Sequence, residues 1–245
     1  MSKLIIRSDE RARTTTEWLD SAHSFSFGDH YDPTNTHHGV LLVQNEDVVA
    51  PGQGFDTHPH AETEIITWVL SGSLVHQDSE GNAGAIYPGL AQRMSAGRGI
   101  LHSERNDHVE SPDPVHVDPV HFVQMWVMPD EFGIDPGYEQ LDIASELQPG
   151  RLVTVASGAP GHDSAIRIAN RGATLSAARL TAGQQVVIPT SRFTHLFVTR
   201  GSGEVDGDLL SSSDALRAAD FGGSTVRAIT DAEVLIWSMD ARLGE

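Results

Sequence analysis

Histidine and glutamate residues with strand-like spacing are the part of this sequence whose chemistry is clearest. His58 and His60 are separated by one residue, and His102 and Glu104 repeat that spacing later in the chain. Side chains alternate between the two faces of a β-strand, so each pair would point to one face. Three imidazoles and one carboxylate that converge would suit a divalent first-row metal such as Fe, Ni, Cu, Mn or Zn. A single strand histidine more often packs or hydrogen-bonds without a metal, but this combination favours a metal site.

The composition narrows the class of protein and the chemistry open to it. The 245 residues include 39% hydrophobic and 20% charged residues, which is typical of a soluble globular protein with one large or two ordinary domains. Asp and Glu outnumber Lys and Arg by 34 to 16, and the net charge of -18 disfavours direct binding to nucleic acid or an anionic membrane. The chain has no cysteine, so disulfides and thiolate metal sites are excluded and any metal must be held by His, Asp or Glu.

The N-terminal residues give no sign of a targeting segment. Leu4, Ile5 and Ile6 form a short apolar stretch, but Arg7 and Asp9 follow at once. This stretch is too short for the core of a signal peptide, and no apolar run approaches the length of a membrane span. We therefore expect a cytoplasmic location.

The rest of the chain predicts an all-β protein in two halves. Short runs rich in Val, Ile, Leu and Thr, separated by Gly, Asn and Pro, extend from Val40 to Leu101 and again from Arg151 onward. This spacing is typical of a barrel or a sandwich. Thr14 and Glu17 have the spacing of a capping box and predict a short helix or turn. Proline and glycine residues between the halves predict a linker over 133–150.

The two halves resemble each other weakly, as in a worn repeat. The segment around Gly72 is similar to the segment around Gly201, an offset of 129 (201 minus 72). This offset carries the three metal-capable positions of the first motif to Val187, Pro189 and Phe193, none of which can bind a metal. We therefore expect the first half to carry the chemistry and the second half to carry structure.

Most of the other histidines have plainer explanations. His76 and His121 fall in predicted strands and are expected to be packed or hydrogen-bonded rather than to bind a metal. His108 and His116 lie among acidic residues and are expected to face solvent. Asp78 is expected to serve the hairpin turn that precedes Gly81-Asn82.

Several blocks of sequence in the same order as in a known family carry a resemblance. Gly52-x5-His58-x-His60-x3-Glu64 reproduces the first cupin motif, and Gly99-x2-His102-x3-Asn106 reproduces the end of the second, with Gly97 in place of its usual proline. More narrowly, the chain resembles the pirin family and its bacterial pirin-like quercetinases. The segments that carry this narrower resemblance are 25–33, 58–60, 76–82, 92–104 and 137–140.

The resemblance implies a bicupin, that is, two consecutive jelly-roll-like β-barrel domains. Residues 1–132 would form the metal-binding domain of the pirin type, 133–150 the linker, and 151–245 a degenerate cupin domain without metal ligands. The implied ligands of one metal are His58, His60, His102 and Glu104. Fe(II) is the metal that we expect most, and Ni, Cu, Mn, Co and Zn are alternatives.

General cupins and pirin-like proteins differ in which glutamate supplies the carboxylate ligand of the metal. General cupins use the glutamate of the first motif, Glu64, whereas pirin-like proteins use the one that corresponds to Glu104. We prefer Glu104, because it shares a strand face with His102. Glu64 would then hold a ligand imidazole or a bound water.

The resemblance also implies an activity. It predicts a metal-dependent dioxygenase of quercetin-like flavonols, whose partners are a phenolic substrate and dioxygen. The flavonol would lose its 3-hydroxyl proton to Glu104, or failing that to Glu64, before dioxygen adds and carbon monoxide is released. The alternatives are a non-enzymatic metal- or redox-sensing regulator that acts on a protein partner, as some pirin relatives do, and a cupin isomerase or lyase that does not use dioxygen.

Overall fold

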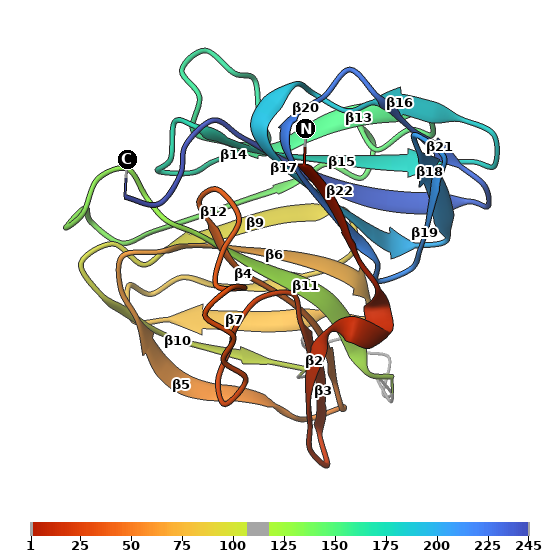
Figure 1. Ribbon diagram of the computed structural model, residues 1–245. Coiled ribbons are helices and arrows are strands. Elements are labelled where there is room, and N and C mark those ends of the chain that lie inside the picture. The colour runs from red at the N-terminus through yellow and green to blue at the C-terminus, as the bar shows by residue number, and fades with distance from the viewer. Residues whose placement is uncertain (1, 107–117, 245) are drawn as a thin grey trace. The chain divides into compact units, whose positions relative to one another are not determined.

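The computed structural model describes residues 2–106 and 118–244 and is built almost wholly from β-strands (Figure 1). Among these residues the only helical element is a short 3-10 turn, η1 (Ser8–Glu10). The prediction of an all-β protein is therefore confirmed. No helix in these two described ranges is long and apolar enough to cross a membrane. His108 and His116 lie outside the described residues.

The chain divides into two compact units, which we call the first and the second barrel. The first barrel comprises Ala12–His37 and Leu41–Ala144, and the second comprises Met1–Arg11, His38–Val40 and Ser145–Glu245. These bounds differ from a simple division at residue 132. The N-terminal strand pairs with a strand of the C-terminal half, and part of the predicted linker forms a strand of the first barrel. Both pairings join residues far apart in sequence, so no local pattern indicates them.

The first barrel contains a seven-stranded and a four-stranded sheet. The larger sheet has the order β12-β9-β6-β11-β4-β3-β2, and the smaller has the order β5-β10-β7-β8. A core cluster that contains Val69, Leu74 and Phe122 takes residues from both sheets, so the two sheets face each other across it. The strands are β2 (Ala12–Thr15), β3 (Leu19–His23), β4 (Leu41–Val49), β5 (Gly54–His60), β6 (Glu64–Ser71), β7 (Leu74–Asp78), β8 (Ala83–Ile86), β9 (Leu90–Ser95), β10 (Ile100–Arg105), β11 (Val120–Val127) and β12 (Gly137–Asp142).

The second barrel repeats this plan. Its sheets have the orders β1-β20-β17-β22-β15-β13-β14 and β16-β21-β18-β19. The edge place that β12 takes in the first barrel is taken here by the N-terminal strand β1. The strands are β1 (Ser2–Ile6), β13 (Arg151–Ser157), β14 (Ile166–Arg167), β15 (Ala173–Leu180), β16 (Gln185–Val187), β17 (Ser191–Arg200), β18 (Ser202–Val205), β19 (Asp208–Ser211), β20 (Ala215–Phe221), β21 (Thr225–Ala228) and β22 (Ala232–Met239).

The matching sheet orders confirm the internal repeat. Gly72 turns the chain between β6 and β7 with φ of 77°, and Gly201 turns it between β17 and β18 with φ of 75°. These are backbone conformations that favour glycine. Of the helix or turn predicted from Thr14 and Glu17, the structure has the turn: the segment is a β-hairpin, in which the side-chain oxygen of Thr16 accepts a hydrogen bond from the Leu19 amide at 3.1 Å.

Candidate metal centre

Two neighbouring strands of the first barrel bring the predicted histidines together. In the antiparallel pairing of β5 with β10, His58 lies opposite His102. The register then shifts, so that Glu104 lies opposite Phe55, which is a β-bulge on β5. Because of this bulge, Phe55 and His58 both face the same cavity although they are three positions apart.

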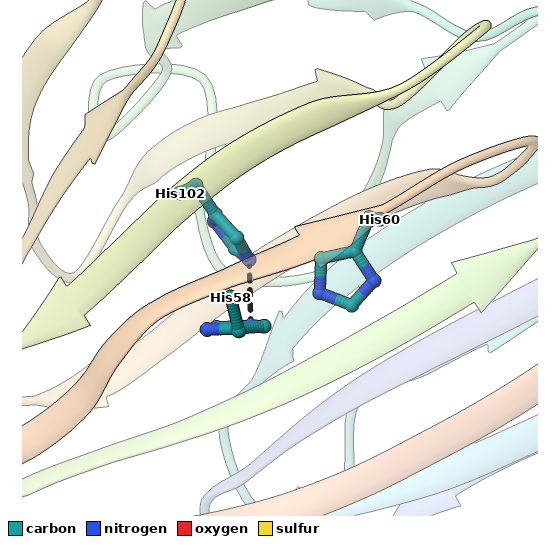
Figure 2. A group of neighbouring side chains, drawn as sticks. All are labelled: His58, His60 and His102. Atoms are coloured by element: carbon teal, nitrogen blue, oxygen red, sulfur yellow. Dashed lines mark hydrogen bonds between the residues drawn. The ribbon is translucent and has the colours of Figure 1, made fainter.

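The donor atoms of His58, His60 and His102 all lie within 4.8 Å of one another. Figure 2 shows the three rings gathered around a common space, with a dashed line between His102 and His58. The Nε2 atoms of these two residues are 3.0 Å apart. Two nitrogens, each about 2.1 Å from one cation in neighbouring octahedral positions, lie about 3 Å apart, so this spacing suits a shared metal.

The protonation states of the rings also suit a cation. Burial, followed by the nearby imidazoles, lowers the pKa of His102 to about 3 and that of His60 to about 4, so both rings are neutral at pH 7. His58 Nδ1 lies 2.7 Å from the Asp56 carbonyl oxygen, which can only accept, so in neutral His58 the lone pair is on Nε2. His60 Nε2 is buried and has no hydrogen-bond partner within the described residues. A buried imidazole nitrogen without a partner is what a metal would satisfy.

Glu104 lies beside His102, in a group that includes neither His58 nor His60. It is 2% exposed, and its carboxylate belongs to a second group of potential ligands with His76 and His102, again within 4.8 Å. The side chain of Gln124 donates a hydrogen bond to Glu104 Oε2 at 2.7 Å, and Thr67 donates to Oε1 at 3.4 Å. Two donors from the facing sheet therefore orient the carboxylate. Sequence reasoning did not single out Gln124, although a buried-strand glutamine flanked by Val123 and Met125 was a usable signal.

Glu64 does not join this cluster. It lies on β6 three positions before Thr67, whose side chain reaches Glu104, so strand alternation places Glu64 on the opposite face of the sheet. There it accepts a hydrogen bond from Ser95 at 2.9 Å and lies 4.0 Å from the Arg93 guanidinium. The structure therefore contradicts the expectation that Glu64 supports the metal site or acts as a base there.

His76 lies immediately behind His102. Its Nδ1 is 3.5 Å from His102 Nδ1, its Nε2 is 3.2 Å from Asp78 Oδ2, and its ring stacks on Tyr138 at 4.9 Å. Burial by itself would raise the pKa of Asp78, but hydrogen bonds from Asn82 and His76 outweigh it and lower the pKa. Asp78 Oδ1 also accepts from the backbone amides of Glu80 and Asn82, so its predicted turn role is confirmed.

A cavity of about 450 Å³ in the first barrel adjoins the histidines. This volume is in the range of pockets that bind small organic molecules. Its walls include His58, His60 and Glu104. The aromatic walls come in edge-to-face pairs, Trp18 with Phe55 at 5.4 Å and Phe27 with Trp126 at 5.6 Å.

The second barrel has an apolar interior in the corresponding place. Both groups of three potential metal ligands that the described residues form lie in the first barrel. On β16 and β21 the buried residues are Val186, Val226 and Ala228, and Ile188 follows on the same face. The offset of 129 had pointed to Val187, which is 57% exposed. The offset does not hold along this strand, and a shift of one residue reverses the face of a strand.

Comparison with known proteins agrees with this architecture. The model of the family Pirin matches residues 6–127, and a model described as Quercetinase C-terminal cupin domain matches residues 154–239. A protein of Escherichia coli named quercetin 2,3-dioxygenase is 36% identical over 235 residues, which cover 95% of this chain and 96% of that protein. The chain belongs to the pirin family. A relative from Mycobacterium tuberculosis is 54% identical over 242 residues, which cover 98% of this chain and 96% of that protein. Its name assigns it provisionally to the quercetin 2,3-dioxygenases.

Solved structures of pirins agree in fold. The pirin YhhW of Escherichia coli, in a structure described as its complex with nickel(II), has a TM-score of 0.86 and 35% identity, and the match covers 98% of this chain and 100% of that chain. A second structure of YhhW has a TM-score of 0.87 at 35% identity, with 98% of each chain covered. The predicted bicupin fold is therefore confirmed, with the metal-capable cluster confined to the first cupin domain over the described residues.

Proposed function

We propose that this pirin is a metal-dependent dioxygenase that cleaves quercetin-like flavonols. The observation that carries the proposal is the position of the histidine cluster and Glu104 on the wall of a cavity with aromatic sides. Relatives that align over almost the whole chain are named quercetin 2,3-dioxygenases. A flat aromatic substrate suits the cavity, because aromatic walls bind aromatic rings by stacked and edge-to-face contacts.

His58, His60 and His102 would hold the metal, with Glu104 as the carboxylate ligand. A bound divalent metal, which we expect to be Fe(II), with Ni, Cu, Mn, Co and Zn as alternatives, would supply positive charge that favours the anionic form of a flavonol and would support reaction with dioxygen. The neutral imidazoles leave that charge undiminished, and only Glu104 offsets part of it.

Glu104 would also accept the proton of the flavonol 3-hydroxyl. A base must reach that hydroxyl directly or through one water, and among the described carboxylates Glu104 is the one that both lines the cavity and belongs to a metal-capable group. Hydrogen bonds from Gln124 and Thr67 keep the carboxylate aimed inward. In the proposed reaction one dioxygen adds across C2 and C4 of the flavonol, the C2–C3 and C3–C4 bonds break, and C3 leaves as carbon monoxide.

The test is turnover of quercetin by aerobic, metal-loaded protein. We expect loss of flavonol absorbance together with release of carbon monoxide. His58→Ala and His102→Ala should abolish both signals. His121→Ala is the matched control, because His121 is also a strand histidine of the first barrel but pairs with Glu46 at 3.0 Å rather than lining the cavity.

Each alternative function gives a different result. Unchanged rates in the two variants of the cluster would reject the assignment of the site. Turnover under strict exclusion of dioxygen would favour an isomerase or lyase. If fully metal-loaded protein turns over no flavonol, and binding to a protein partner depends on the oxidation state of the metal, the regulatory alternative replaces the enzyme.

A further inference from the structure

A buried carboxylate and a buried histidine lie behind one of the proposed metal ligands. The side chains of Asp78 and His76 are both 0% exposed. They extend in one line from the hairpin turn at the end of β7 to His102: Asp78 Oδ2 to His76 Nε2 at 3.2 Å, then His76 Nδ1 to His102 Nδ1 at 3.5 Å. The other ring nitrogen of His102, Nε2, faces His58 at 3.0 Å.

The direction of each hydrogen bond in this line follows from the previous one. An ionised carboxylate can only accept, so Nε2 of His76 carries the proton that it donates to Asp78. In a neutral imidazole the other nitrogen then has only a lone pair, so Nδ1 of His76 accepts. His102 must therefore donate from Nδ1, which leaves the lone pair of its Nε2 directed at the space shared with His58 and His60.

We propose that Asp78 and His76 are positioning residues that fix the tautomer of His102, so that His102 Nε2 presents a lone pair to the metal. The inference rests on the proposed metal site but does not depend on the substrate. It gives segment 76–82, the third of the segments that carry the pirin resemblance, a role beyond the turn. Partners that orient a ligating histidine in this way are known to raise metal affinity by fixing the ring and its tautomer.

The same distances allow a competing arrangement. His76, His102 and Glu104 form a group of potential ligands by themselves, so His76 could in principle bind a second metal. The hydrogen-bond directions disfavour this, because Nδ1 of His102 carries a proton in the proposed tautomer and Nε2 of His76 is engaged by Asp78. The proposal therefore predicts one metal per chain.

Asp78→Asn is the sharpest test, because it keeps both hydrogen bonds between residue 78 and His102 but reverses the direction in which each one is donated. The asparagine oxygen can still accept from the backbone amides of Glu80 and Asn82. Its amino group takes the place of Oδ2, so it donates to His76 Nε2 and gives up the bond that Oδ2 accepts from the Asn82 side chain at 2.9 Å. His76 must then carry its proton on Nδ1, and His102 must carry its proton on Nε2, where it blocks the metal. Glu80→Gln is the matched control, since it makes the same chemical change in the same turn, where the Glu80 side chain is exposed.

Two measurements decide the question. In chelator-treated protein, long-range ¹H–¹⁵N spectra should show His102 with its proton on Nδ1 in the wild type and in Glu80→Gln, and on Nε2 in Asp78→Asn. Titration with Ni²⁺ should give one metal per chain and an affinity about 10–100-fold weaker in Asp78→Asn. His76→Phe, which retains a ring to stack on Tyr138, should weaken binding to a similar degree and provides a second variant if Asp78→Asn does not fold.

The proposal is overturned if wild-type His102 carries its proton on Nε2, or if the folded Asp78→Asn or His76→Phe protein binds Ni²⁺ as tightly as Glu80→Gln. Two metals per chain in the wild type, reduced to one by His76→Phe, would establish the competing arrangement. Normal Ni²⁺ binding without flavonol turnover would reject the proposed enzyme and leave this inference standing.

Discussion

Replacing Gln124 with leucine tests whether the first barrel orients Glu104 before a metal binds. Gln124 connects two groups: its amide donates to Glu104 at 2.7 Å, and its carbonyl accepts from the Trp126 indole at 3.0 Å. Leucine has a similar volume, so Gln124→Leu removes both hydrogen bonds with little change in packing. The carboxylate is then left with the longer Thr67 contact at 3.4 Å.

The expected cost follows from the kind of bond that is lost. A hydrogen bond to a charged group contributes about 1.5–3 kcal/mol, because the buried carboxylate has no equally good replacement partner. The Trp126 indole is only partly buried and lines the cavity, so water can replace its lost acceptor at small cost. We expect the free energy of unfolding of chelator-treated protein to fall by about 2–3 kcal/mol. Metal affinity should fall about 10–100-fold, because the carboxylate loses its orientation.

The assay combines urea unfolding with Ni²⁺ titration of the same protein. Gln77→Leu is the matched control, because Gln77 lies exposed on β7, which pairs with β10, the strand that carries Glu104. A double-mutant cycle with Glu104→Leu should give a coupling energy of about 1.5–3 kcal/mol between the two side chains. A coupling energy near zero, or an affinity equal to that of Gln77→Leu, would refute the reasoning that Gln124 holds the carboxylate.

Two further predictions concern pH and backbone conformation. Because the pKa values of His60 and His102 in the folded protein, about 4 and about 3, lie below the usual value of 6.5, the unfolded chain binds more protons below pH 6.5. The stability of chelator-treated protein should therefore fall as the pH decreases from about 6.5 toward 4. The urea midpoint of the double variant His60→Gln/His102→Gln should fall less over the same range. An equal fall would contradict the assignment of this pH dependence to His60 and His102. Gly201→Ala should destabilise the second barrel far more than Gly207→Ala. The angle φ is positive at both positions (75° and 87°), but an added Cβ meets the Asp231 carbonyl oxygen only at Gly201. Equal thermal midpoints of the two variants would show that this close approach is unimportant.

Most of the metal-capable cluster could be read from the sequence because its ligands are paired on strands. A spacing of two residues places His58 and His60 on one strand, and His102 with Glu104 on the other, whatever the surrounding fold. The similar segments around Gly72 and Gly201 likewise predicted two related halves. These are local properties, set by strand alternation and by which residues tolerate a turn.

Tertiary structure decided the points that depend on contacts across sheets. The sequence motifs offer both Glu64 and Glu104 as ligands, with Glu104 preferred, and the Thr67 contact with Glu104 shows that Glu64 faces the other way. The sequence predicts His76 only as a packed or hydrogen-bonded strand histidine, whereas the fold places its ring between Asp78 and His102.

Chain topology further limited how much of the fold the sequence could predict. Strand β1 lies at one end of the chain and completes a sheet of the second barrel, which no periodicity within residues 1–11 indicates. The inward face of β16 could not be assigned from an averaged repeat offset, because a shift of one residue turns Val187 outward and Val186 inward. The sequence by itself therefore determined which residues can bind a metal and that they sit on strands. Only folding placed Glu104 beside His102 and turned Glu64 away, because that depends on pairing between segments far apart in the chain.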